Sequence, residues 1–185
     1  MAYIGLANIV LAKCNGNNGS VSYSNGMRFG RAMKVSIDPK YEDIGDYGDI
    51  NDDEDDEVFS YADVTLDTAE IEMEASKLAF GHEGNQDDCL ENEQDRGGYV
   101  GIGLRTKETI NGSVNYLAIW LYKVKLKEDG ENHETAGETG KYDTVTTTGK
   151  AVPCENGNWR RKKKFKTLQE ADDWLNDMAG IEKGE

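Results

Sequence analysis

The chain has 185 residues, of which 37% are hydrophobic and 31% charged, and its mean hydropathy is −0.74. This length suits one domain with a sizeable core, so we expect a single domain over residues 1–185. No stretch approaches the roughly 20 apolar residues of a membrane-spanning helix. The amino terminus lacks a basic start and a small-residue cleavage site, so the sequence predicts neither a membrane partner nor a secretory signal.

The formal net charge of −15 comes from one part of the chain. Between Tyr41 and Ser76 there are fifteen acids and no Lys or Arg, whereas the rest carries 21 acids and 21 bases. Residues 42–57 hold ten of these acids, and because like charges repel, they predict an extended solvated loop. Residues 160–166 hold six bases. We expect the two blocks to pair, either within one subunit or between copies.

The first third of the chain predicts strands. Residues 3–13 predict a strand before a Gly/Asn-rich turn at 14–20, and residues 27–38 predict one or two more. Residues 57–66 predict a strand with alternate residues on one face: Val58, Ser60, Ala62, Val64 and Leu66. The strands on either side of the acidic loop should form a long hairpin that projects beyond the domain body.

A helix and a hairpin are predicted next. Residues 68–82 have apolar side chains at helical spacing, with Gly81 placed to end the helix: Ile71, Ala75, Leu78 and Ala79. After a polar loop at 82–95, the strands 97–110 and 113–127 flank Asn111-Gly112, a strong hairpin signal.

The second of these strands is apolar on both faces. One face is predicted to hold Tyr116, Trp120, Tyr122, Val124 and Leu126, and the other Leu117, Ile119 and Leu121. Such a strand is covered on both sides, by a core and by a helix or a second subunit.

Residues 141–153 and 156–166 predict the last strands, and 167–180 a final helix. Thr167 and Glu170 have the spacing of a capping box, ahead of an apolar stripe made of Leu168, Ala171, Trp174, Leu175 and Met178. Two helices and about eight strands predict a mainly β (α+β) fold: an antiparallel β-sandwich or barrel with a flanking helix and a C-terminal helix.

No catalytic motif is present, and neither GxSxG, HExxH nor a P-loop occurs. His82 and His133 lie in polar stretches that predict surface positions. Gly101 and Gly103 lie in a strand pattern without a third glycine, which predicts a packing feature. The cysteines, Cys14, Cys89 and Cys154, are odd in number and have no CxxC spacing, so they predict free thiols.

The acids do not form a calcium motif. Asp49, Asn51 and Asp53 have the alternate spacing of an EF-hand loop, but Glu54 and Ser60 replace its glycine and its twelfth ligand. We therefore expect no enzymatic activity, no dedicated metal site and no cofactor.

Three segments, taken together, resemble a known protein family. They are residues 63–82, the sequence AIWLYKVKL at 118–126, and residues 159–175. Their order and spacing are similar to those of the major tail proteins (tail tube proteins) of long-tailed bacteriophages of Gram-positive hosts, over most of the chain from about Met27. The resemblance implies a β-sandwich subunit that forms hexameric rings, which stack into a tube with a negatively charged lumen for DNA.

The resemblance therefore predicts a structural virion protein, located in the phage tail after synthesis in the host cytoplasm. Its partners would be copies of itself and the tape measure, terminator and baseplate or tip proteins, while genomic DNA passes through without specific binding. Residues predicted to make contacts between rings or subunits are Asp52, Asp53, Glu54, Asp55, Asp56, Arg160, Arg161, Lys162, Lys163 and Lys164. The alternative is an acidic DNA mimic that binds a basic host DNA-binding protein.

Overall fold

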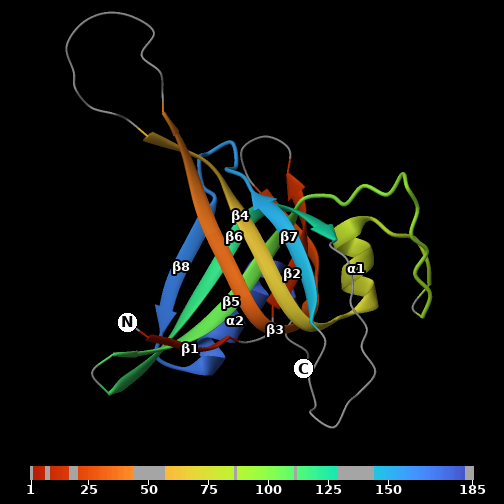
Figure 1. Ribbon diagram of the computed structural model, residues 1–185. Coiled ribbons are helices and arrows are strands. Elements are labelled where there is room, and N and C mark those ends of the chain that lie inside the picture. The colour runs from red at the N-terminus through yellow and green to blue at the C-terminus, as the bar shows by residue number, and fades with distance from the viewer. Residues whose placement is uncertain are drawn as a thin grey trace, which may run out of the picture.

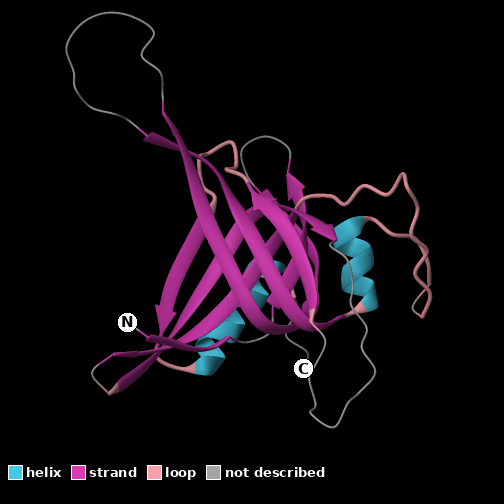
Figure 2. Cartoon of the chain, viewed as in Figure 1, coloured by secondary structure: helices cyan, strands magenta, loops and turns pink. Residues whose placement is uncertain are grey.

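A computed structural model describes residues 2–6, 9–16, 21–43, 57–85, 87–110, 112–128 and 144–181. The fold in these ranges is mainly β, with antiparallel strands and two helices, as the sequence predicts (Figures 1 and 2). In chain order the elements are β1 (Ala2–Leu6), β2 (Ile9–Gly16), β3 (Val21–Asp43), β4 (Glu57–Ile71), α1 (Met73–Phe80), β5 (Val100–Ile110), β6 (Ser113–Glu128), β7 (Val145–Ala151), β8 (Arg160–Phe165) and α2 (Leu168–Ala179).

Six of the strands form a closed ring. Antiparallel pairing runs from β5 to β2, β3, β4, β7 and β6, and β6 pairs with β5 again. The two remaining strands extend this sheet, because β1 pairs with the end of β5 beyond β2, and β8 pairs with β6 beside β7. The arrangement is thus a barrel rather than two separate sheets.

Apolar side chains from every strand of the ring fill its interior. The pleat places alternate residues inward, so Ala62, Val64 and Leu66 of β4 are buried while the residues between them are partly exposed. The helix α1 adds Ala75 and Phe80 to this core and ends at Gly81, whose φ of 84° is a left-handed cap.

The helix α2 packs on the outside of the barrel against β6, β5, β3 and β2 (Figure 2). Its capping box forms as predicted, since Thr167 Oγ1 accepts a hydrogen bond from the Glu170 amide and the Glu170 carboxylate accepts one from the Thr167 amide. A second core forms under this helix, around Trp120 of β6 and Leu175 of α2, and both side chains are buried. The double-sided covering of β6 is therefore confirmed, and a helix provides the second layer.

The two glycines of β5 lie where this second core leaves no room for a side chain. A Cβ on Gly101 would lie 2.5 Å from ring atoms of Trp120 and Tyr23, and one on Gly103 would lie 2.8 Å from Trp120. The prediction of a packing role for this pair is confirmed.

Three predicted details of the strands are wrong. Residues 3–13 form two strands rather than one, and Ile71 ends β4 instead of starting the helix. The predicted facing of β6 fails after Tyr122, because a register shift against β5 turns Val124 and Leu126 to the interior core with Leu121.

A similar shift between Lys40 and Tyr41 alters the start of β4. Val58 is 48% exposed, and Phe59 packs against the core in its place.

Neither of the two described helices is long and apolar enough to cross a membrane.

Candidate functional site

The predicted basic run forms β8, which lies at one end of the sheet order. It pairs with β6 from Arg160 opposite Leu121 to Phe165 opposite Tyr116. Within the described ranges no strand pairs with the other edge of β8. Among the described residues, the backbone N–H and C=O groups on that edge therefore have no strand partner.

The alternation of the strand divides the basic run between two faces. Arg160, Lys162 and Lys164 lie on the face that continues the interior core, as their cross-strand neighbours show. Arg161 and Lys163 lie on the face of α2, where the Arg161 guanidinium stands over the Trp174 ring at 5.8 Å. Five consecutive bases therefore do not form one continuous patch.

Lys164 forms an ion pair within its own chain. Its Nζ lies 2.7 Å from Oε2 of Glu108, a carboxylate on β5 whose side chain is fully buried. A buried carboxylate without a counter-charge is strongly destabilising, so this pair serves the fold. Lys164 is thus a predicted contact residue whose role is explained by an ion pair within the same chain.

Arg160 lies beside the outer end of the β3–β4 pair. The rings of Phe59 and Trp159 stack with centroids 4.3 Å apart, Tyr41 meets Phe59 edge-on at 6.0 Å, and the Arg160 guanidinium covers Trp159 at 4.2 Å. Burial lowers the pKa of Arg160. This aromatic cluster joins the start of β8 to the point where the acidic segment begins.

The predicted acidic contact residues, Asp52, Asp53, Glu54, Asp55 and Asp56, lie outside the described residues. The structure gives only the attachment of their segment, because Asp43 at the end of β3 pairs with Glu57 at the start of β4. Antiparallel pairing of the two flanking strands agrees with the predicted hairpin, and the projection of its loop stays a prediction.

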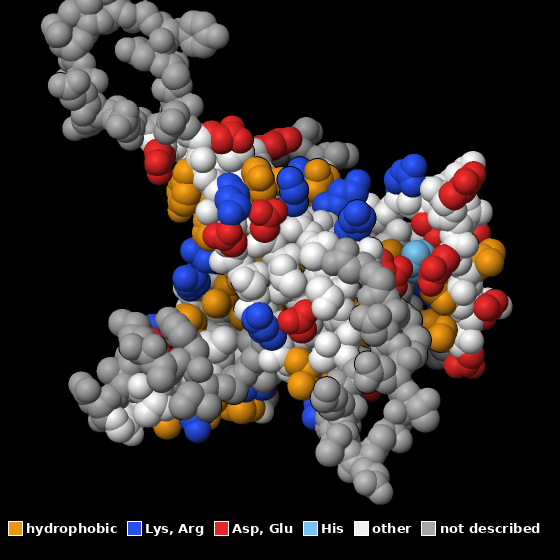
Figure 3. All heavy atoms as spheres, in the orientation of Figure 1, with side chains coloured by type: hydrophobic (Ala, Val, Ile, Leu, Met, Phe, Trp, Pro, Cys, Tyr) orange, Lys and Arg blue, Asp and Glu red, His pale blue; other side chains and the backbone are white. Residues whose placement is uncertain are grey.

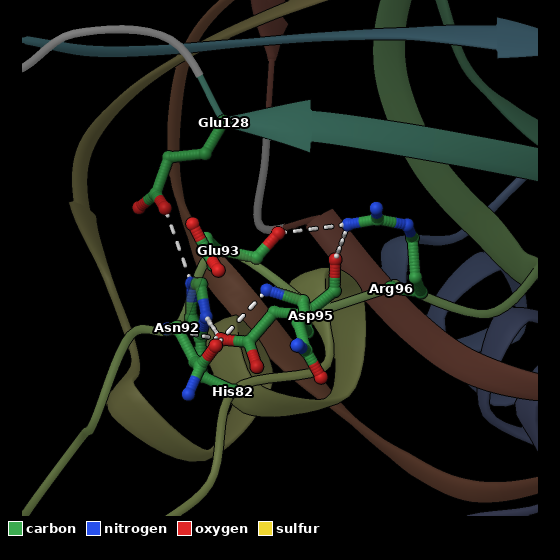
Figure 4. A network of polar contacts seen from close by, with 7 residues as sticks. His82, Asn92, Glu93, Asp95, Arg96 and Glu128 are labelled. Atoms are coloured by element: carbon green, nitrogen blue, oxygen red, sulfur yellow. Dashed lines mark hydrogen bonds and ion pairs between the residues drawn. The ribbon is translucent and has the colours of Figure 1, made fainter.

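A polar network that the sequence analysis missed surrounds His82, in the loop after α1 (Figure 4). The Nδ1 of His82 lies 2.7 Å from Oδ2 of Asp95, and its Nε2 lies 3.1 Å from Oε2 of Glu128 at the end of β6. The Asn92 amide donates to the same Asp95 oxygen at 2.9 Å. Acidic side chains gather on this side of the molecule (Figure 3).

The predicted surface position of His82 is wrong, since its side chain is only 8% exposed. Burial disfavours the charged imidazolium, but the hydrogen bonds to Asp95 and Glu128 outweigh it and raise the pKa of His82 above its ordinary value. The same contact with His82 lowers the pKa of Asp95. An imidazole held between two carboxylates can hold a cation, either a proton or a metal ion.

The cysteines are free thiols, as predicted. Cys154 is buried, and Cys14 and Cys89 are half-buried. Burial raises the pKa of all three thiols, which keeps them in the unreactive protonated form at neutral pH.

Comparison with known proteins gives no family model that matches this chain, and no curated protein matches it either.

Proposed function

We propose that this chain is a tail tube subunit of a long-tailed bacteriophage, which polymerises into stacked hexameric rings around a negatively charged channel. The observation that carries the proposal is the placement of opposite charges. The basic strand β8 lies at an open sheet edge, and the acidic segment 44–56 is attached to the outer end of the β3–β4 pair.

Charge on an open edge also selects the geometry of assembly. Two β8 edges repel each other, because each carries Arg161, Lys162 and Lys163, so symmetric pairing of like edges is disfavoured. A contact between β8 and a different, acidic surface of a second copy is attractive. Contacts between unlike surfaces are heterologous, and they build rings or filaments.

The acidic segment has enough length to reach a neighbour. It contains thirteen residues that begin and end at paired strand termini, so its tip can reach at most about 20 Å from the strands. Lys164 pairs with a carboxylate of its own chain. Arg161 and Lys163 lie on the α2 face over the rings of Trp174 and Phe165, and an aromatic ring does not neutralise a charge, so these two bases are the preferred targets of an acidic segment of a neighbouring copy. Acids on the channel wall would repel passing DNA within a Debye length of about 8 Å.

Electron microscopy of the purified full chain over a concentration series, with light scattering, tests the proposal. We expect rings or tubes of uniform diameter with a central channel. A protein that stays monomeric at every concentration, yet binds a basic DNA-binding protein in a salt-sensitive way, would support the DNA mimic instead.

A charge exchange tests the pairing of the two blocks. We expect Arg161→Glu with Lys163→Glu to abolish assembly, and replacement of Asp52, Asp53, Asp55 and Asp56 by Lys in the same chain to restore it. The control pair, Lys13→Glu with Lys127→Glu, makes the same charge change on β2 and β6 and should assemble normally. Equal loss in both pairs would show that net charge alone matters.

A further inference from the structure

We infer that His82, Glu91 and Glu128 form a binding site for a divalent transition-metal ion such as Zn²⁺. Their candidate ligand atoms all lie within 4.8 Å of one another. His82 and Glu91 come from the one loop that joins α1 to β5, and Glu128 comes from the end of β6. The inference is independent of the proposed assembly.

Asp95 prepares the histidine for this role. With the proton on Nδ1, the ring donates to Oδ2 of Asp95 at 2.7 Å, and that carboxylate is itself fixed by the Asn92 amide. A carboxylate behind a histidine is the usual outer partner of a metal ligand, because it fixes the tautomer and the ring orientation. The Nε2 lone pair is then directed at Glu128.

The contact on the other side of the ring requires a cation. Nε2 and Oε2 of Glu128 are 3.1 Å apart, and in the neutral tautomer with the proton on Nδ1 both are acceptors. A positive charge must therefore lie between them, which is either the second ring proton or a metal ion. Bonds of about 2.0–2.1 Å from zinc to nitrogen and oxygen put two neighbouring ligands about 2.9 Å apart at a right angle and about 3.3 Å apart at the tetrahedral angle. The observed spacing falls between these values.

The third ligand and the route of entry are also present. Glu91 is exposed, so its side chain can rotate onto an ion held by the other two residues. His82, Asp95 and Glu128 line a cavity of about 700 Å³ that gives the ion access. One imidazole with two carboxylates favours a transition metal over Mg²⁺ or Ca²⁺, which prefer sets made of oxygen alone.

An ion at this site would tie the polar loop 82–97 to the end of β6. The loop contains one isolated backbone bridge, between Glu83 and Leu90, and no helix or strand among its described residues. Metal binding would therefore protect this loop from proteolysis, a readout that does not depend on any activity.

Calorimetry of the full chain, purified with a chelator and then titrated with ZnCl₂, tests the inference. We expect one strong site, with a rise in Tm and slower cleavage within 82–97. His82→Ala and Glu128→Gln should abolish this site. Asp95→Asn should weaken it by about 10–100-fold, as expected for an outer partner. Glu91→Gln changes an exposed residue and tests the third ligand without a risk to folding.

Controls separate this site from the other metal-binding groups of the chain. His133→Gln removes the only other histidine and should leave zinc affinity unchanged. Spectra of the Co²⁺ form should lack thiolate charge transfer, which excludes the cysteines, and MgCl₂ should not compete. Strong binding that survives His82→Ala, or no binding by the chelator-treated protein, would overturn the inference and leave a proton between His82 and Glu128.

Discussion

Trp120 limits the size of the side chains that can pack against it. It is fully buried between the sheet and α2, it meets Tyr23 edge-on with ring centroids 5.0 Å apart, and its ring covers Gly101 and Gly103. A close-packed interior of this kind does not absorb even one added methyl group without displacement.

We therefore expect Gly101→Ala to lower the free energy of unfolding by about 1–3 kcal/mol, because the new Cβ would displace the rings of Trp120 and Tyr23. Urea denaturation measures this change. Gly98→Ala is the matched control, since a Cβ there meets nothing within 4 Å, and its effect should stay within about 0.5 kcal/mol. Equal effects at both positions would contradict the packing argument.

Thiol reactivity gives a second prediction at the residue scale. Because burial raises the pKa of Cys14 and Cys154, the thiolate fraction at neutral pH is small. We expect slow alkylation of the folded protein by iodoacetamide at pH 7.5, with a rate that rises as the pH increases. Mass spectrometry follows the reaction, and protein unfolded in urea is the control. Rapid labelling of Cys14 and Cys154 in the folded protein at pH 7.5 would contradict the conclusion that these thiols are protonated at neutral pH.

At the scale of single elements, the sequence predicts which strands and helices are present better than it predicts the bulges within them. The sequence predicts about eight strands and two helices, and the described residues form eight strands and two helices, two of the strands arising from the single one predicted over 3–13. The hairpin at Asn111-Gly112 and the helix after Thr167 are predictable because both depend on local signals. The sequence does not predict the bulges near Tyr41 and Tyr122. A bulge is a mismatch in length between paired strands, and one strand read alone gives no sign of its partner.

The helix α2 offers a comparison within one element. Leu175 is 2% exposed and lies in the core under the helix, whereas Leu168 is 43% exposed. Leu175→Ala should lower the free energy of unfolding by about 2–5 kcal/mol through the cavity it leaves. Leu168→Ala should change it by less than about 1 kcal/mol. Thermal or urea denaturation measures both, and similar losses would show that α2 docks differently.

At the scale of the whole molecule, the sequence predicts where charged residues cluster along the chain, but not which residues lie next to them in the folded protein. The basic run at 160–166 is evident in the sequence. Its division between two faces and the pairing of Lys164 with Glu108 depend on strand neighbours, which the sequence does not show. The polar sequence neighbours of His82 predict a surface position for it. Its contact with Glu128 joins residues 46 positions apart, and only the folded chain brings these two together.

The closed ring also affects how the chain is made. Residue 10 of β2 pairs with residue 103 of β5, so β2 must wait for a partner that is synthesised far later. At about 5–20 residues per second, the nascent chain keeps the inward side chains of β2 uncovered for roughly 5–20 s. Folds dominated by such distant strand pairs close slowly, in milliseconds to seconds. During synthesis the amino-terminal strands thus expose apolar side chains and unpaired edges, which are prone to aggregation. A ribosome-bound chain of this protein should therefore depend on chaperones until β5 has emerged.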